Sequence, residues 1–122
     1  IFYKNGVPSP TNRYLVNGDI CDRGTLATEI WAVFLAFMCI WPEAVMIQRG
    51  NHEDRLLNMD FHCGGFYDEV LSKYGRTSGT GSLVYEKFCR IFARLPLATI
   101  VDSQVFIVHG GLSRSAAGGY LR

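Results

Sequence analysis

Three short polar clusters hold most of the residues in this chain whose side chains could do chemistry. Each contains glycine and follows a short apolar segment, and together they cover residues 18–24, 49–53 and 109–111. Ligands of α/β sheets bind just beyond the carboxyl ends of the strands. If the apolar segments are neighbouring strands, Asp19, Asn51 and His109 converge there. A carboxylate, an amide oxygen and an imidazole suit Mn, Fe or Zn, so the clusters predict a metal site.

The same clusters carry groups suited to an anionic substrate. Arg23 and Arg49 add fixed positive charge, which fits a phosphate. His52 is a candidate general acid or base, and Asp22 could orient its ring. The clusters therefore predict phosphoryl chemistry beside the metal site.

Each of these residues also has an ordinary structural interpretation. Asp19 could cap a turn, Asn51 could occupy a left-handed turn and His109 could be a core histidine. Arg49 could pair with a surface carboxylate, and Glu53 suits an ion pair or a cap better than catalysis. Because the same pattern recurs at three strand ends, we favour the functional interpretation.

The apolar pattern predicts an α/β arrangement that would bring the clusters together. Thr25 is the expected cap of the first long helix, and Pro42 would end it. The expected elements are a loop over 4–12, strands over 14–16 and 44–47, a helix over 25–41, helical residues over 53–74 broken at Gly64-Gly65, a mobile loop over 75–82, an amphipathic helix over 83–95, and a hairpin of strands 97–101 and 105–108.

Composition and charge narrow the expected partners. The 122 residues are 48% apolar and 19% charged, which is enough to bury a core. Twelve basic and eleven acidic residues give a formal charge of +1, so nothing favours nucleic acid or an anionic membrane as partner. The apolar run over 30–41 is shorter than the roughly 20 residues of a membrane span, and it predicts a buried helix.

The cysteines and the first residue bear on the cellular compartment and on whether the chain is part of a longer product. The four cysteines form no Cys-x-x-Cys pair, and their spacing favours buried, reduced thiols in a cytoplasmic protein, with the nucleus as the other option. We expect His62 and Cys63, which share a polar turn, to be structural. The chain begins at Ile1 without a signal-peptide pattern, so we expect it to start inside a longer product.

Taken in order, the clusters resemble the signature motifs of the phosphoprotein phosphatase family. The spacing is also about that of the family. Within the family, residues 5–9 and 34–38 and Asp54 most resemble the subgroup with tetratricopeptide or EF-hand modules, and the EF-hand type is slightly favoured. The matching motifs are Gly18-Asp19-x-x-Asp22-Arg23-Gly24, Arg49-Gly50-Asn51-His52-Glu53, Leu95-Pro96-Leu97-Ala98 and His109-Gly110-Gly111-Leu112-Ser113.

The resemblance implies a protein serine/threonine phosphatase with two metal ions. The expected fold is a partial calcineurin-like metallophosphatase sandwich, with mixed sheets flanked by helices. Residues 1–122 would form the central part of the catalytic domain, incomplete at both ends. Asp19 would bridge both ions, and Asn51 and His109 would ligate the second, with manganese favoured over iron or zinc.

The resemblance also implies how the substrate is held and cleaved. Arg23 and Asn51 would bind phosphate oxygens of a phosphoprotein. A metal-bound hydroxide would attack phosphorus in line. His52, supported by Asp22, would protonate the leaving serine or threonine oxygen. Regulatory domains would lie outside this chain.

The chain departs from the family pattern in several places. Cys21 stands where the family usually has valine, and Cys63-Gly64-Gly65-Phe66 replaces a shorter tyrosine-glycine-phenylalanine. The family's Asp-x-His motif would precede Ile1, and a further histidine ligand and a phosphate-binding arginine would follow Arg122. We therefore expect these 122 residues alone to be inactive.

Two other functions fit the same strand-end clusters. Another metallophosphoesterase, such as a dinucleoside tetraphosphate hydrolase, would share the metal site. A non-catalytic interaction protein could keep only the shell of the fold. The first long helix and the Leu95-Pro96-Leu97-Ala98 stretch favour the protein phosphatase.

Overall fold

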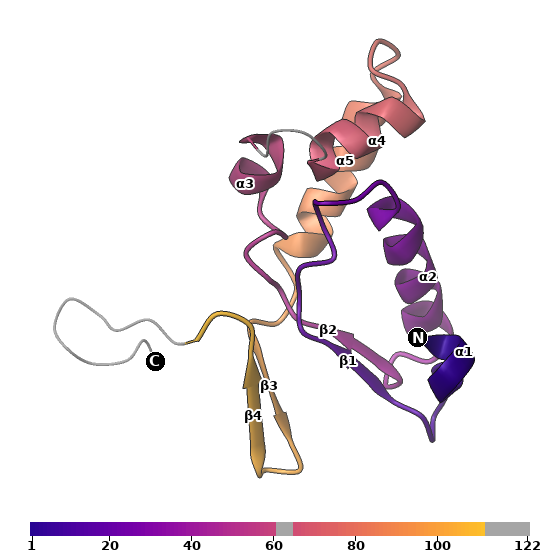
Figure 1. The fold of residues 1–122 in the computed structure, drawn as a ribbon, viewed down its shortest axis with the longest axis vertical. Coiled ribbons are helices and arrows are strands. Elements are labelled where there is room, and N and C mark those ends of the chain that lie inside the picture. The colour runs from indigo at the N-terminus through magenta and orange to yellow at the C-terminus, as the bar shows by residue number, and fades with distance from the viewer. Residues whose placement is uncertain (61–64, 112–122) are drawn as a thin grey trace, which may run out of the picture.

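The computed structural model describes residues 1–60 and 65–111 (Figure 1). In this part of the chain, no helix is long and apolar enough to cross a membrane. The predicted α/β order is confirmed. The elements are α1 (Phe2–Asn5), β1 (Tyr14–Val16), α2 (Ala27–Ile40), β2 (Val45–Ile47), α3 (Arg55–Asp60), α4 (Phe66–Tyr74), α5 (Thr80–Phe92), β3 (Ala98–Val101) and β4 (Val105–Val108).

Two small sheets position the strand ends. β1 and β2 pair in parallel through the crossover helix α2, with Val16 opposite Ile47. β3 and β4 form the expected antiparallel hairpin. Its base is joined to the end of β2, because the Gln48 side chain donates to the Ile107 carbonyl at 2.8 Å and the Arg49 amide donates to the Pro96 carbonyl at 2.9 Å. The ends of β1, β2 and β4 therefore meet in one place.

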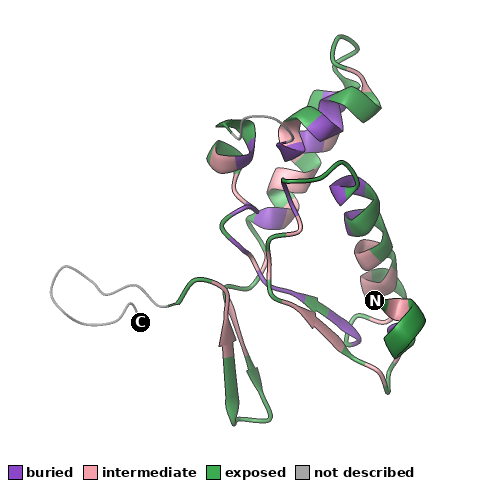
Figure 2. Ribbon diagram, in the orientation of Figure 1, coloured by how far each residue is buried: buried purple, intermediate pink, exposed green. Residues whose placement is uncertain are grey.

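The core lies among α2, α4 and α5, beside the end of the parallel sheet (Figure 2). Trp31 of α2 is fully buried, and its ring centroid is 5.3 Å from that of Phe92 on α5. Phe66, the first residue of α4, packs edge-on against Phe88 at 5.1 Å. These rings fix α2 and α4 beside each other, and the loop from β1 to α2 passes between the core and the site.

Several element boundaries differ from the prediction. The short helix α1 overlaps the expected loop over 4–12. α5 begins at Thr80, inside the expected loop over 75–82, and it ends at Phe92, before residue 95. The glycine-rich start of α5 has weak local propensity, so packing against α4 extends the helix there. The predicted break is confirmed at Gly65, which precedes α4 and is not helical, but His62, Cys63 and Gly64 lie outside the described residues.

Two burial predictions are corrected. The helix over 30–41 is not buried all round, since Ile30, Val33 and Ile40 of α2 are at least 44% exposed. Only one side of α2 faces the core. The cysteines are free where described, but they are not all buried, because Cys39 is exposed while Cys21 is buried. The hairpin also exposes apolar side chains on β3 and β4 (Figure 2).

Candidate active site

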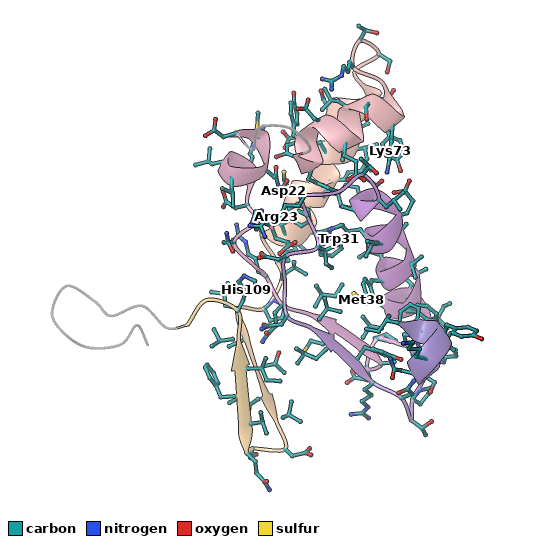
Figure 3. All side chains as sticks on the ribbon, viewed as in Figure 1. Asp22, Arg23, Trp31, Met38, Lys73 and His109 are labelled. Atoms are coloured by element: carbon teal, nitrogen blue, oxygen red, sulfur yellow. The ribbon has the colours of Figure 1, made fainter. Side chains whose placement is uncertain are left out.

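The three predicted metal ligands come together at the strand ends. Nε2 of His109 lies 3.2 Å from Oδ2 of Asp19 and 3.1 Å from Oδ1 of Asn51. Asp19 follows β1, Asn51 follows β2 and His109 follows β4. The parallel pairing of β1 with β2 and the link from β2 to the hairpin produce this convergence, and Figure 3 shows His109 at the base of the hairpin.

Two glycines let the first two loops approach this closely. A Cβ atom on Gly18 would lie 2.5 Å from the Gly50 nitrogen, and Gly18 also has a left-handed φ of 75°. A Cβ atom on Gly50 would lie 2.3 Å from Oδ1 of Asp19. Side chains at these positions would push the two loops apart, so the glycines of the motifs set the ligand spacing.

The buried carboxylate of Glu53 fixes the loop that carries Asp19. It accepts hydrogen bonds from the amides of Asp19 at 2.7 Å, Ile20 at 2.8 Å, Cys21 at 3.1 Å and Gly50 at 2.8 Å. Backbone donors to a charged acceptor make strong hydrogen bonds in a buried place. The expectation that Glu53 acts as a cap is confirmed.

The loop after β1 stores backbone strain. Asp19, Asp22 and Arg23 have left-handed φ values of 57°, 67° and 59°. Such conformations cost of order 1–3 kcal/mol each outside glycine and persist where surrounding contacts hold them. Asn51 is not among the described residues with positive φ, so its interpretation as a left-handed turn residue is wrong.

Asp22 and His52 form a buried pair beside the ligands. Nδ1 of His52 lies 2.6 Å from Oδ2 of Asp22, and the Phe66 amide donates to Oδ1 of Asp22 at 2.6 Å. The guanidinium of Arg23 lies 3.2 Å from Nε2 of His52. Because a guanidinium only donates, Nε2 is the acceptor and Nδ1 carries the proton toward Asp22. This pairing holds the ring in one tautomer and orientation.

The arrangement of His109 fits a metal ion. Its Nδ1 lies 2.5 Å from the carbonyl of Asn17, which can only accept, so Nδ1 carries a proton, and in the neutral imidazole that ligates metals Nε2 keeps its lone pair. That lone pair faces the oxygens of Asp19 and Asn51 at 3.2 and 3.1 Å. A cation among these three atoms relieves their mutual repulsion. A ring nitrogen bonded to a carbonyl is also the usual support of a ligating histidine.

The spacing of the donor atoms agrees with this interpretation. Neighbouring ligands of a six-coordinate ion with bonds of about 2.1 Å are about 3 Å apart. The donor set contains only one histidine and one carboxylate. Accordingly, the described residues hold no group of three or more histidine, cysteine, aspartate or glutamate side chains that could bind a metal. The amide oxygen of Asn51 is the third donor.

A cleft of about 800 Å³ opens beside the ligands. Asn51 and His109 line it, together with Arg49 and the start of β3. Arg49 is not available as a free cation, since it donates to Oδ2 of Asp54 at 3.1 Å and to the Glu53 carbonyl at 3.0 Å. The alternative interpretation of Arg49, pairing with a carboxylate, is confirmed. Arg23 is exposed and is the better-placed cation for an anionic substrate.

Sequence reasoning missed the backbone groups that complete the site. The Asn17 carbonyl holds His109, and the Phe66 amide holds Asp22. Neither contact has a signature in the local sequence, because a backbone donor or acceptor is present at every such residue. Leu112 and Ser113, the end of the third motif, lie outside the described residues.

Comparison with known proteins gives consistent results. Residues 2–121 match the family model of the calcineurin-like phosphoesterases. The human serine/threonine-protein phosphatase with EF-hands 2 is 43% identical over 113 residues, which cover 93% of this chain and 14% of that protein. Serine/threonine-protein phosphatase 5 of Solanum lycopersicum is 42% identical over 112 residues, covering 92% of this chain and 18% of that protein.

A solved structure shows the same fold. It is a protein serine/threonine phosphatase from Saccharomyces cerevisiae with similarity to human phosphatase PP5, and it matches with a TM-score of 0.82 at 34% identity. The match covers 92% of this chain and 33% of that chain. The expected metallophosphatase fold and the resemblance to phosphatases with EF-hands are confirmed. The chain spans less than a fifth of the length of the human and tomato relatives.

The element order, the strand-end site and the relatives agree. The family model covers nearly the whole chain, and the relatives and the solved structure that match over more than nine-tenths of it are all named serine/threonine phosphatases. The chain belongs to the calcineurin-like phosphoesterase family, within its branch of serine/threonine phosphoprotein phosphatases.

Proposed function

We propose that these residues form part of the active site of a metal-dependent protein serine/threonine phosphatase. The observation that carries the proposal is the convergence of Asp19 and Asn51, whose side-chain oxygens lie within 3.2 Å of Nε2 of His109, next to the buried Asp22–His52 pair. The names of the relatives, all serine/threonine phosphatases, support the substrate class.

Asp19, Asn51 and His109 would hold a divalent cation, and we propose manganese ahead of iron or zinc. A cation bound there supplies Lewis-acid chemistry, polarising phosphoryl oxygens and activating water. Asn51 is exposed and borders the cleft, so its amide also reaches the substrate side. A second ion would share Asp19, whose Oδ1 meanwhile accepts the His52 amide at 3.1 Å.

Arg23 would bind the phosphate group of the substrate, and His52 would protonate its leaving group. Arg23 binds phosphate oxygens, and on doing so its guanidinium leaves Nε2 of His52, which it contacts at 3.2 Å in the free protein. Nε2, released from Arg23, would then take up a proton from water, and His52 would pass that proton to the leaving oxygen of serine or threonine. Asp22 holds Nδ1 at 2.6 Å throughout, so the ring stays aimed at the leaving group.

The test uses the full-length protein and phosphoserine and phosphothreonine peptides. We expect release of inorganic phosphate that a chelator abolishes and manganese restores. Asp19→Asn removes a charged ligand and should lower turnover by at least ~10²-fold, the order of loss when metal activation fails. Asp102→Asn is the matched control, because Asp102 lies in the exposed hairpin turn and asparagine tolerates its φ of 50°.

Unchanged peptide hydrolysis after Asp19→Asn would contradict the proposal. So would equal losses in the two variants, since the hairpin turn does not touch the site. Hydrolysis of a dinucleoside tetraphosphate in preference to the peptides would move the chain to the other class of phosphoesterase.

A further inference from the structure

The loop that carries Asp22 and Arg23 is held on its β1 side by Glu53, as described above. On the other side it runs into α2 through Leu26. Leu26 occupies the cap position, and its side chain makes no cap hydrogen bond within the described part of the chain. Thr25, the cap expected from the sequence, does not fill this role. The first amides of α2 therefore need an acceptor from elsewhere.

That acceptor comes from α4. The carboxylate of Glu69 accepts the Ala27 amide at 3.2 Å, the Thr28 amide at 2.8 Å and the Thr28 hydroxyl at 2.8 Å. Glu69 is only 6% exposed. A carboxylate at a helix N-terminus is stabilised by the free amides and by the helix dipole. Glu69 thus caps a helix that lies some forty residues earlier in the chain.

Lys73, one turn further along α4, holds the residues just before and inside the start of α2. Its ammonium donates to Oε1 of Glu69 at 2.9 Å, to the Thr25 carbonyl at 2.5 Å and to Oε2 of Glu29 at 2.5 Å. Figure 3 shows Lys73 where α4 passes the first turn of α2. The contact with Thr25 fixes the loop two residues beyond Arg23.

The N-terminus of α4 holds the other side of Arg23. The amide of Phe66 donates to Oδ1 of Asp22 at 2.6 Å. Phe66 acts through its backbone amide at the first position of α4, and the Glu69 and Lys73 side chains, four residues apart, act from one face of the same helix. One rigid helix thus binds Asp22 and Thr25, and Arg23 lies between these two points in a left-handed conformation.

A neighbouring ion pair, between Asp68 of α4 and Arg76 just beyond the end of the helix, shows that this arrangement is specific. Asp68 and Arg76 pair at 3.0 Å, but both side chains are more than 50% exposed and contact neither the loop nor α2 in the described structure. Glu69, by contrast, is buried and connects two elements. The two carboxylates are adjacent in sequence and differ in what they hold.

We propose that Glu69 and Lys73 are positioning residues that set where Arg23 and Asp22 stand in the active site. The inference rests on the proposed function and adds two residues outside the three motifs. They touch neither substrate nor metal, and they act through the loop. Loss of either pairing releases the loop between Asp22 and Ala27, and Arg23 moves from its place beside Nε2 of His52.

The experiment is a double-mutant cycle in the full-length protein, with a phosphopeptide as substrate and inorganic phosphate as inhibitor. Glu69→Gln should lower kcat/KM and weaken phosphate inhibition about 10-fold each, since a displacement of about 1 Å can cost ~10²-fold. Asp68→Asn should leave both values unchanged. In an Arg23→Ala background, Glu69→Gln should weaken phosphate inhibition by less than about 2-fold further, because its effect on phosphate affinity passes through Arg23.

A second pair of variants covers the case in which Glu69→Gln does not fold. Lys73→Gln keeps the carboxylate cap and removes the contact with Thr25, so it should show a smaller loss of phosphate inhibition. Lys73→Arg, which can still donate to Thr25 and Glu69, should restore most of it. A purely structural contact would change the melting temperature without this selective change in phosphate affinity.

The possible outcomes separate the inference from the proposed function. Equal losses from Glu69→Gln with and without Arg23 would overturn the positioning role, as would a loss of the same size from Asp68→Asn. If Arg23→Ala itself leaves phosphate inhibition unchanged, the phosphate-binding role of Arg23 fails, and the positioning role fails with it. If Arg23→Ala weakens phosphate inhibition and the effects of Arg23→Ala and Glu69→Gln are fully additive, only the positioning role is rejected, and the proposed function stands.

Discussion

Nδ1 of His52 lies 2.6 Å from Oδ2 of Asp22, and both side chains are buried. The second oxygen of Asp22 accepts the Phe66 amide, so neither side chain is free to rotate. The buried carboxylate holds one ring nitrogen, and the other, Nε2, faces the guanidinium of Arg23 at 3.2 Å. The geometry is that of an oriented acid–base group, and it supports a role for His52 in proton transfer.

We expect His52→Ala to lower the turnover of a phosphopeptide by ~10²- to 10⁴-fold, the usual contribution of a general acid. Asp22→Asn should act in the same direction, because the single amide oxygen is needed to accept the Phe66 amide, which leaves an NH2 donor facing Nδ1 and favours the other tautomer of the ring. Steady-state kinetics on the full-length protein measure both effects.

An aryl phosphate serves as the internal control for the His52 prediction. Its leaving group departs without a proton, so His52→Ala should reduce its hydrolysis far less. Metal content, measured by elemental analysis, should stay the same. Equal losses on both substrates would assign His52 to the structure of the site and not to proton transfer.

The crossing of the two loops at Gly18 and Gly50 gives a prediction about metal affinity. A Cβ atom on Gly50 would meet Oδ1 of Asp19 at 2.3 Å and Oε2 of Glu53 at 2.8 Å. Gly50→Ala should therefore displace Asp19, weaken manganese binding in a calorimetric titration and lower the free energy of unfolding by about 1–3 kcal/mol, as overpacking does.

Gly24→Ala is the matched control for this substitution. No described atom lies within 4 Å of the Cβ position of Gly24, and its φ is not left-handed. The methyl group should be tolerated, with manganese affinity close to that of the wild type. Similar losses in the two variants would show that the close approach of the loops does not set the metal site.

The acid stability of the protein should report on Glu69. Burial, the largest influence, raises the pKa of Glu69, but hydrogen bonds from the Thr28 amide, Lys73, the Thr28 hydroxyl and the Ala27 amide together hold the pKa below its ordinary value of 4.5. A carboxylate with a depressed pKa in the folded state stabilises the protein above its ordinary value, and this stabilisation is lost as the pH falls through the depressed pKa.

We therefore expect wild type to be more stable than Glu69→Gln near neutral pH and the difference to shrink as the pH falls below 4.5. Urea unfolding of the full-length proteins from pH ~6 to pH ~3 measures it. Asp68→Asn, which alters an exposed pair, should show little difference at any pH. A stability difference between wild type and Glu69→Gln that does not change with pH would contradict this account.

The sequence by itself determined which residues meet at the site. Asp19, Asn51 and His109 each follow an apolar strand, and the ends of the parallel strands β1 and β2 must lie together. His109 follows β4 of the separate hairpin, and the Gln48 contact with Ile107 brings that strand to the same place. Residue type then limits the chemistry, because only certain side chains ligate metals or transfer protons. The α/β order followed from the same periodicity.

Only the tertiary structure decided which partner each polar group has. The local sequence predicted Thr25 as the cap of α2. Glu69 of α4 fills that role instead, because the core packs α4 against α2. The Asn17 carbonyl sets the tautomer of His109, and four backbone amides converge on Glu53. A sequence shows which groups can donate or accept, but distance in the folded chain selects among them.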